Sequence, residues 1–453
     1  MPFLAFFKHK TFPILLVNFI GILGYSLVIP ILIFIVTDFG GNGFIYGVLG
    51  AMYPFFQFIG APILGRLSDK IGRKKVLIIS QAGTFLAWLL FLLAFILPEM
   101  MLWSQDSGFT GKYQMTLPLL IIFFARIFDG FTGGNISVAN AYMSDISTDA
   151  DRNRNFGRMG ASTSLGFVLG PAVAGILAST LLGEMLPLIL AALISLTAIF
   201  VINVRLEESV PCIVDTKGVS LRNFRRFFQI EHKDCFSEGE LQATGNIKKN
   251  GWRTILRISG IPLLFTIYFL TFFGFSLFYA GLPVYANSLL SWSATDLGIF
   301  LAYSSFIMVI VQGPILSKLS TQVSNHTLVL VGSLFLGASF LFLTSEKIII
   351  LYFANTLLSI GNGIMWPSFL SLLSSTGTKS TQGAIQGYGT SMGSFASMLG
   401  LITGGILFEN LTTYIFVIGG FLFFIITILM IVHGVRHNTK KSTRKNKSVI
   451  LSS

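Results

Sequence analysis

Long apolar stretches recur along the whole chain and are separated by short polar turns. Each stretch holds about 20 residues, the length that an α-helix needs to cross ~30 Å of hydrocarbon. The alternating strands of about ten residues that mark a membrane β-barrel are absent. The pattern predicts an all-α membrane protein with about twelve transmembrane helices, near residues 12–36, 44–66, 76–97, 117–145, 157–181, 184–204, 258–287, 296–318, 327–345, 348–374, 383–408 and 413–436.

A polar segment at residues 205–257 divides the predicted helices into two sets of six. We expect a six-helix bundle at 1–204, a cytoplasmic linker at 205–257, a second six-helix bundle at 258–436 and a basic cytoplasmic tail at 437–453. Three arginines lie near three phenylalanines within residues 222–228. The linker is therefore either a flexible connection or the site of a short amphipathic helix on the inner leaflet.

The two halves share sequence patterns. Residues 60–75 (GAPILGRLSDKIGRKK) have a degenerate copy at 312–320 (QGPILSKLS), and residues 166–177 (GFVLGPAVAGIL) resemble 400–407 (GLITGGIL). Two pseudo-symmetric bundles suit alternating access, in which one half rocks against the other around a central site.

Composition and charge agree with a membrane protein. The chain is 53% hydrophobic and 11% charged, whereas soluble domains carry about 25% charged residues. Nearly all Lys and Arg fall at the two ends and in the even-numbered loops; only Lys112 and Lys347 lie on the opposite side, and Arg126 lies within a helix. Cytoplasmic loops hold the excess of basic residues, so both termini are predicted in the cytoplasm. The net charge of +12 reflects this asymmetry and not a nucleic-acid surface.

Other classes of protein lack support in the sequence. The first apolar stretch is too long for a cleavable signal, so we expect it to be retained. Cys212 and Cys235 fall in the linker without metal-ligand spacing and are expected to be free thiols. No nucleotide loop, metal cluster or nucleophile triad is recognisable, so we expect no cofactor, no metal and no enzymatic activity.

One ion pair is predicted within the membrane. Asp129 is the only acidic residue placed deep in a predicted helix, and Arg126 shares its helix face at i,i+3 spacing. An unpaired charge near the midplane costs several kcal/mol, so such residues usually mark a transport pathway. Protonated Asp129 would release Arg126 to a substrate or another acceptor, and deprotonated Asp129 would pair with it. A permanently closed pair that only ties helices together is the alternative.

Two further segments are candidates for gating. Gly65 allows a neighbouring helix to approach closely, and Asp69 is placed to pair with Arg73. This loop is either a cytoplasmic gate or only a topological anchor. Gly170 and Pro171 remove one backbone hydrogen bond and permit a bend, which either helps to set the direction of transport or serves close packing.

Substrate contacts are sought among polar and amphipathic residues within the predicted helices. Any one of them is more often an interhelical hydrogen bond than a ligand contact. We select Gln57 and Trp366 first, followed by Tyr53, Asn135 and Asn362.

These segments resemble the major facilitator superfamily, and within it the twelve-helix drug:proton antiporters of the tetracycline-efflux type. Residues 65–75 resemble the loop between helices 2 and 3 of that family, and residues 122–134 its helix-4 motif built around an arginine. Residues 166–175 resemble the helix-5 antiporter motif, with Ala174 where glycine is usual, and residues 53–57 (YPFFQ) also resemble the efflux group. The resemblance implies the major facilitator fold, a coupling role for Arg126, and a place for Asp69 at the start of helix 11, near Gln382.

Two positions depart from the family. Glutamine is usual where Asp129 stands, and helix 1 of the efflux group commonly has an aspartate where this chain has Gly21. If a proton is carried, Asp129 must carry it nearly alone; otherwise the transporter is not coupled to protons.

We therefore predict a secondary active transporter that exports a small amphipathic organic compound by proton-coupled alternating access. Its partners would be the small-molecule substrate, protons and the lipid bilayer, with no nucleic acid, and the protein would act as a monomer in the cell (inner or plasma) membrane. The alternatives are a facilitator or importer of a metabolite such as an amino acid, sugar or chelator, and a transporter-like receptor that does not cycle.

Overall fold

The computed structural model describes residues 10–133, 135–148, 151–209, 252–376 and 382–450. The predicted linker lies almost wholly outside these residues, together with its arginine–phenylalanine segment and both cysteines. The structure therefore tests neither interpretation of the linker.

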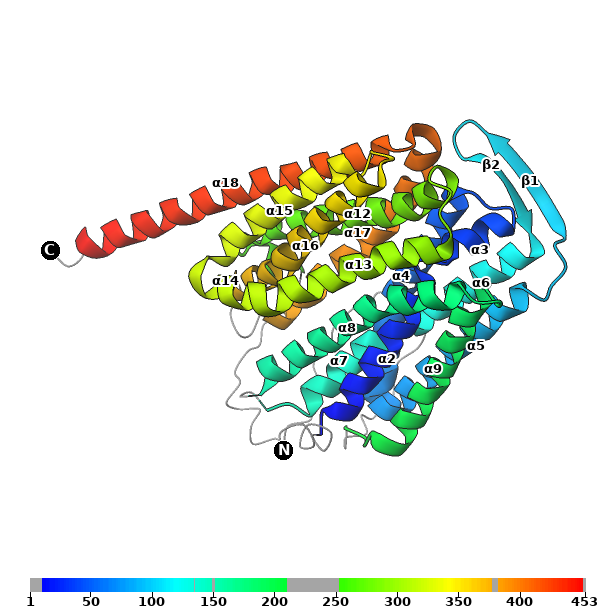
Figure 1. The fold of residues 1–453 in the computed structure, drawn as a ribbon. Coiled ribbons are helices and arrows are strands. Elements are labelled where there is room, and N and C mark those ends of the chain that lie inside the picture. Colours follow the sequence, from blue (N-terminus) through cyan, green and yellow to red (C-terminus); the bar gives the residue numbers. More distant parts are fainter. Residues whose placement is uncertain (1–9, 134, 149–150, 210–251, 377–381, 451–453) are drawn as a thin grey trace. The chain divides into compact units, whose positions relative to one another are not determined.

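The helices of the first half follow the predicted apolar stretches (Figure 1): α2 (Phe12–Val28), α3 (Leu32–Asp38), α4 (Gly43–Ile71), α5 (Arg73–Ala94), α6 (Leu117–Thr132), α7 (Asn135–Asp145), α8 (Arg152–Ala178) and α9 (Met185–Arg205). The first predicted span is bent, because α2 and α3 meet at an angle of 40°. Pro30 lies at this bend and cannot donate the backbone hydrogen bond that a continuous helix needs.

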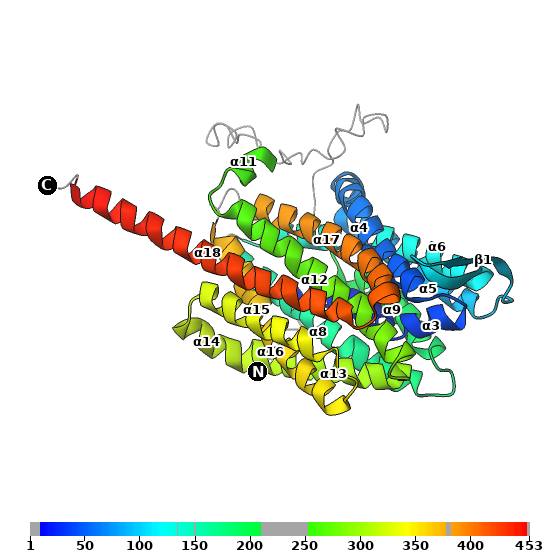
Figure 2. The ribbon, with the colours of Figure 1, turned by 90° about the horizontal axis from the view of Figure 1, so that it is seen from above.

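The second half contains α11 (Trp252–Leu256), α12 (Ile261–Ser288), α13 (Ala294–Ile310), α14 (Leu316–Gln322), α15 (Asn325–Phe342), α16 (Ile348–Thr376), α17 (Gln382–Leu411) and α18 (Tyr414–Ile450). A π-helical turn, η1 (Val311–Ile315), joins α13 to α14 and contains Pro314. Helix α18 continues through the predicted basic tail as far as Ile450 (Figure 2).

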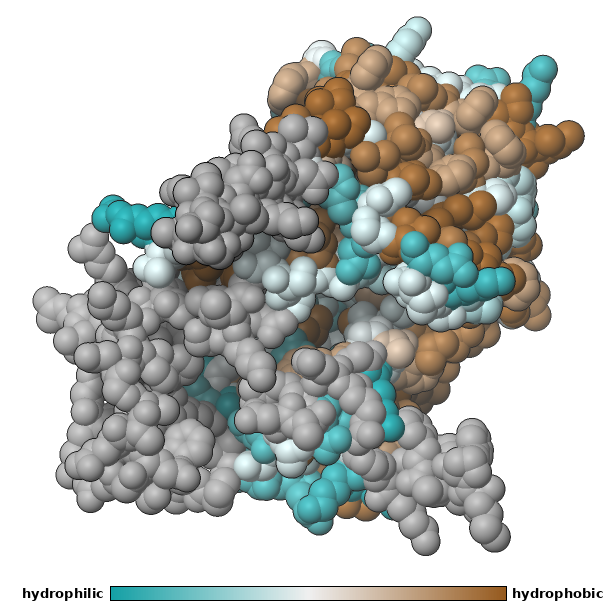
Figure 3. Space-filling model, turned by 90° about the vertical axis from the view of Figure 1, so that its left-hand side faces the viewer, coloured by the Kyte–Doolittle hydropathy of each residue, from teal (hydrophilic) through white to brown (hydrophobic). Residues whose placement is uncertain are grey.

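Among the described residues, eleven helices are long and apolar enough to cross a membrane, or twelve when the bent pair counts as one span. The prediction of an all-α membrane protein with about twelve spans is confirmed. The long apolar region at 157–204 breaks between Ser179 and Glu184, where Gly183 has a φ of 52°. Figure 3 shows one end of the molecule, where hydrophobic side chains cover broad areas of the described surface.

A β-hairpin between α5 and α6 was not predicted. Strand β1 (Met101–Ser107) pairs antiparallel with β2 (Gly111–Thr116). The hairpin lies at the end of the first half that is remote from the N-terminus (Figure 1). Three hydrogen bonds attach it to the α3–α4 connection: Gln114 N–H to Gly40 O at 2.8 Å, Asn42 Nδ2 to Thr110 O at 2.7 Å, and Thr116 Oγ1 to Phe39 O at 2.8 Å.

Packing divides the chain into two units. The first unit runs to Ile247 and includes Ala286–Ala302, and the second contains Lys248–Tyr285 and the chain from Tyr303 onward. In the first unit α2 packs on α8 and α9, while α6 packs on α4 and α5; in the second, α15 packs on α16 and α18. The predicted boundaries of two six-helix bundles stay a prediction.

Candidate functional site

Arg126 and Asp129 lie one turn apart on α6 and form an incomplete ion pair. Arg126 Nη1 is 3.8 Å from Asp129 Oδ2, and the two side chains are 4% and 3% exposed. Arg126 Nε and Nη1 and Asp129 Oδ2 have no hydrogen-bond partner among the described residues. Buried charged groups are normally hydrogen-bonded, so both side chains keep capacity for a further partner.

Aromatic rings surround the Arg126 guanidinium. Its Cζ lies 5.9 Å from the centre of the Tyr53 ring and 6.0 Å from that of Phe91, within the range of cation–π attraction. The Tyr25 and Tyr53 rings are 4.4 Å apart. These rings hold the cation in place without neutralising its charge.

Glycines on α6 explain why Tyr53 reaches this position. A Cβ atom on Gly130 would lie 2.6 Å from Tyr53 O, and one on Gly133 would lie 2.6 Å from the Tyr53 hydroxyl oxygen. On the α4 side, a side chain on Gly60 would collide with the Phe131 carbonyl. Helices α4 and α6 therefore touch backbone to backbone, which small residues permit in membrane bundles.

A small cavity of about 40 Å³ lies inside the first unit beside Asp129. Residues of α2, α4, α5, α6 and α7 line it, and its volume suits a few water molecules and no larger compound. The lining is mixed: apolar residues such as Ile22, Leu77 and Trp88 stand beside polar or amphipathic ones, which are Asn18, Tyr25, Tyr53, Gln81, Thr84, Asp129 and Asn135.

The predicted substrate residues of the first half have different surroundings. Tyr53 and Asn135 line the cavity with Asp129. Gln57 instead donates to Gly133 O at 3.1 Å and to the Tyr53 hydroxyl at 3.3 Å. Its amide therefore forms an interhelical hydrogen bond of the kind that polar residues usually make in membranes.

Trp366 and Asn362 lie on α16 of the second unit. The Trp366 ring is 5.4 Å from Tyr268, 5.2 Å from Phe272 and 5.9 Å from Phe369, measured between ring centres. Asn362 Nδ2 lies 3.8 Å from the sulfur of Met308. Trp366 is thus part of an aromatic cluster within its own unit.

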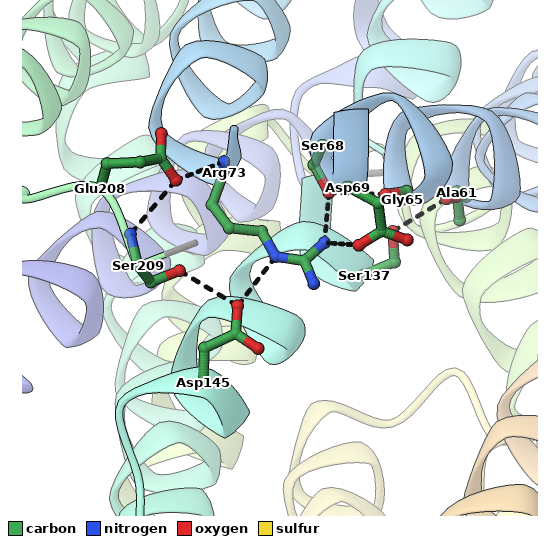
Figure 4. A network of polar contacts seen from close by, with 9 residues as sticks. All are labelled: Ala61, Gly65, Ser68, Asp69, Arg73, Ser137, Asp145, Glu208 and Ser209. Atoms are coloured by element: carbon green, nitrogen blue, oxygen red, sulfur yellow. Dashed lines mark hydrogen bonds and ion pairs between the residues drawn. The ribbon is translucent and has the colours of Figure 1, made fainter. Parts of the chain in front are cut away.

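Arg73, at the start of α5, is the centre of a polar network (Figure 4). Its Nη1 lies 2.7 Å from Asp69 Oδ1 and its Nε lies 3.0 Å from Asp145 Oδ2, although the Arg73 side chain is only 6% exposed. Nη1 also donates to the Ser68 hydroxyl. The pairing of Asp69 with Arg73 that the sequence predicts is present, and Asp145 was missed.

Glu208, which follows α9, completes this network through the backbone. Its carboxylate accepts from the N–H of Arg73 at 2.7 Å and of Lys74 at 3.2 Å, and so satisfies free N–H groups at the start of α5. Gly72 has a φ of 103°, and a side chain there would collide with Glu208. At Gly65 an added Cβ would lie 3.6 Å from Ser137 Oγ of α7, which is ordinary van der Waals contact, and Ser137 donates to Ala61 O at 2.9 Å. The gating role of Gly65 stays a prediction.

The glycines of α8 pack closely on other helices of the first unit. Side chains at Gly166 and Gly170 would collide with α2, and the Ser26 hydroxyl donates to Gly166 O at 2.8 Å. A Cβ on Gly175 would lie 2.8 Å from the Cα of Gly298 in α13. Helix α8 is assigned as continuous through Pro171.

Gln81 and Thr84 were not among the predicted site residues. They lie at i and i+3 on α5 and face the cavity together with Trp88, one turn further along. A signal was available, because Gln81 is a strongly polar residue within an otherwise apolar stretch.

The family model described as Major Facilitator Superfamily matches residues 14–345 and 264–452. The chain is 26% identical over 396 residues to the class C tetracycline resistance protein of Escherichia coli, covering 86% of this chain and 88% of that protein. It is 25% identical over 422 residues to multidrug resistance protein 2 of Bacillus subtilis (strain 168), covering 91% and 93%.

Solved structures share the fold at lower identity. The crystal structure of the human organic anion transporter MFSD10 (TETRAN) matches with a TM-score of 0.64 at 20% identity, covering 93% of this chain and 99% of that chain. The crystal structure of a D-xylose–proton symporter matches with a TM-score of 0.69 at 13% identity, covering 93% and 97%.

Proposed function

Because the chain belongs to the Major Facilitator Superfamily, it is a multi-pass membrane transporter and not an enzyme, and we propose that it exports a small amphipathic organic compound in exchange for protons. The resemblance to the tetracycline-efflux group, found first in the motifs, is confirmed by the relatives named for tetracycline and multidrug resistance. These names support the substrate class. The glycine-rich motif of α8 supports export, and the distribution of basic residues supports a cytoplasmic position for both termini.

The observation that carries the proposal is the incomplete ion pair of Arg126 and Asp129. At 3.8 Å, opposite charges attract by about 4 kcal/mol at an effective dielectric constant of 20. Removing both charges from water costs several kcal/mol for each ion, and additional hydrogen bonds are needed to offset that cost. Three polar atoms of this pair lack such bonds, which makes the pair a weak structural tie. It is better suited to changing its protonation state.

Proton exchange at Asp129 would change the charge of this site. With Asp129 ionised, its charge offsets that of Arg126; with Asp129 protonated, the site carries one positive charge and Arg126 is released to another acceptor. Substrate entry from the cytoplasm is expected to favour the ionised pair, so that a proton leaves as the substrate binds. Uptake of a proton from the outer side then resets the transporter.

Gating is assigned to two other parts of the first unit. The network around Arg73 and Asp69 holds the α4–α5 loop rigidly, as a cytoplasmic gate requires. Gly170 lies where α8 contacts α2, and the Pro171 carbonyl lies against Gly298 of α13, so motion there would alter the packing of α8 on both helices. For the substrate we retain the residues selected from the sequence, which are Gln57, Trp366, Tyr53, Asn135 and Asn362.

A passive facilitator is the second candidate, and Gly21 is the observation that favours it. Gly21 lines the cavity where the efflux group commonly has an aspartate, so Asp129 is the only carboxylate among the described residues of the lining. With a single carboxylate, the site has one proton carrier at most.

Everted membrane vesicles distinguish these functions. Vesicles that contain the protein would be given a panel of radiolabelled cationic and zwitterionic drugs under an imposed pH gradient, acid inside. We expect uptake above the equilibrium level, which nigericin abolishes by removing the gradient. Uptake that reaches equilibrium regardless of the gradient would indicate a facilitator, and a protein that binds compounds without moving them would be a receptor.

A further inference from the structure

Part of the wall of the cavity beside Asp129 is polar, and Gln81 in this wall has hydrogen-bonding capacity that the protein does not use. Gln81 is only 2% exposed and lines the cavity, and no hydrogen bond joins its side chain to any residue that the structure describes. Its side chain can donate two hydrogen bonds and accept two. Leaving a buried polar group unsatisfied costs about 1–3 kcal/mol.

Asn18, on α2, is another polar residue of this wall. Its Nδ2 donates to the hydroxyls of Ser162 at 2.7 Å and Thr163 at 2.8 Å, which fixes the amide in the cavity lining. Asn135, on α7, also lines the cavity. Together with Asp129 Oδ2, polar groups from four helices face one small volume.

Water is the ligand that these groups fit. A buried water molecule makes about three hydrogen bonds to polar groups that would otherwise be unsatisfied. The cavity of about 40 Å³ has room for a few such molecules and is too small for an organic substrate. Amide groups can both donate to water and accept from it, whereas an apolar wall would leave the same volume dry.

We propose that this cavity is a water-binding site through which Asp129 exchanges its proton, with Gln81 as the residue that positions the water. This inference rests on the proposed function, because it supplies the route for the coupled proton. Gln81 itself gains and loses no proton. Its role is to hold a water molecule in line with the Asp129 carboxyl.

The proton transfer balances without any further reactant. The O–H bond of the protonated Asp129 breaks as a new O–H bond forms on the adjacent water, which then passes a different proton to the next water. The carboxylate left behind pairs with Arg126. The other titratable groups at the site are the hydroxyls of Tyr25 on α2 and Tyr53 on α4; α5 and α7 contribute none to the described lining.

The test compares Gln81→Leu with the parent protein in proteoliposomes. Leu has a similar size and cannot hold water. We expect substrate-triggered proton release to slow by about tenfold or more, equivalent to at least 1.4 kcal/mol in the barrier, while the Kd of the drug is unchanged. Gln81→Asn, which keeps the amide on a shorter side chain, should slow release less. Gln105→Leu on the exposed face of β1 is the matched control and should behave as the parent.

The controls separate failure of this inference from failure of the proposed function. Proton release at the parent rate in Gln81→Leu, with release abolished in Asp129→Asn, would overturn the water route and leave antiport intact. Parent-like release in Asp129→Asn would overturn the proposed function itself. If Gln81→Leu does not elute as a folded monodisperse protein, the comparison of Gln81→Asn with the parent decides, and equal rates would refute the proposal.

Discussion

Arg73→Met should destabilise the first unit measurably. The substitution removes the guanidinium that contacts Asp69, Asp145 and Ser68 and keeps the backbone bond to Glu208. A hydrogen bond to a charged group contributes about 1.5–3 kcal/mol. Because Asp69 and Asp145 are 33% and 25% exposed, water replaces part of each lost contact. We expect the free energy of unfolding to fall by about 2–3 kcal/mol.

The assay is unfolding of the purified protein in mixed micelles with increasing dodecyl sulfate, followed by circular dichroism. Lys75→Met is the matched control, since Lys75 is exposed two residues further along α5. A substitution at such a surface position should change stability by no more than about 0.5 kcal/mol. If Arg73→Met changes stability as little as the control, the network is screened by solvent and the reasoning is refuted.

Three other substitutions test separate parts of the account. Gly170→Ala should lower the free energy of unfolding by about 1–3 kcal/mol because the added methyl group collides with Ser26. The control is Gly160→Ala, whose methyl group meets no atom within 4 Å and which should be neutral or stabilising. Equal effects of the two substitutions would contradict close packing at Gly170. Thr116→Val should lower the free energy of unfolding by about 1–2 kcal/mol, because it removes the N-cap of α6 and the hydrogen bond from Thr116 Oγ1 to Phe39 O. An unchanged unfolding midpoint would show that neither bond contributes to stability. Arg126→Lys should lower drug transport at least about tenfold, because an ammonium cannot reproduce the planar guanidinium between aromatic rings; parent-like flux would show that only charge is required.

Most of the fold could be predicted because each membrane helix is encoded locally. An apolar run of sufficient length forms a helix wherever it meets lipid, so the predicted ranges match the observed ones. The break between α8 and α9 was also located, at Ser179–Glu184. The bend that divides the first span into α2 and α3 was not predicted, although Pro30 gave a local signal for it.

The hairpin shows what local patterns leave out. Strand β1 is exposed along nearly all its length, so it lacks the alternation of buried and exposed positions that identifies a strand. The position of the hairpin depends on bonds from β2 to Gly40 and Phe39, residues more than 60 positions earlier in the chain. Such contacts follow from tertiary packing.

The candidate site divides in the same way. The proximity of Arg126 and Asp129 could be predicted because residues three positions apart on one helix are neighbours on its surface. The approach of Gln81 to the same cavity depends on how α5 packs against α6, where Gly83 lies against Thr132. Polarity alone also cannot show that Gln57 is used for a bond to the α6 backbone.

The most direct test of the central claim is proton release from purified protein in proteoliposomes, comparing the parent with Asp129→Asn. Asn preserves the size of the side chain and cannot carry a proton. The account predicts that adding a transported drug releases protons from the parent and none from Asp129→Asn, while both variants bind the drug. Drug flux without proton movement in the parent, or proton release that persists in Asp129→Asn, would contradict it.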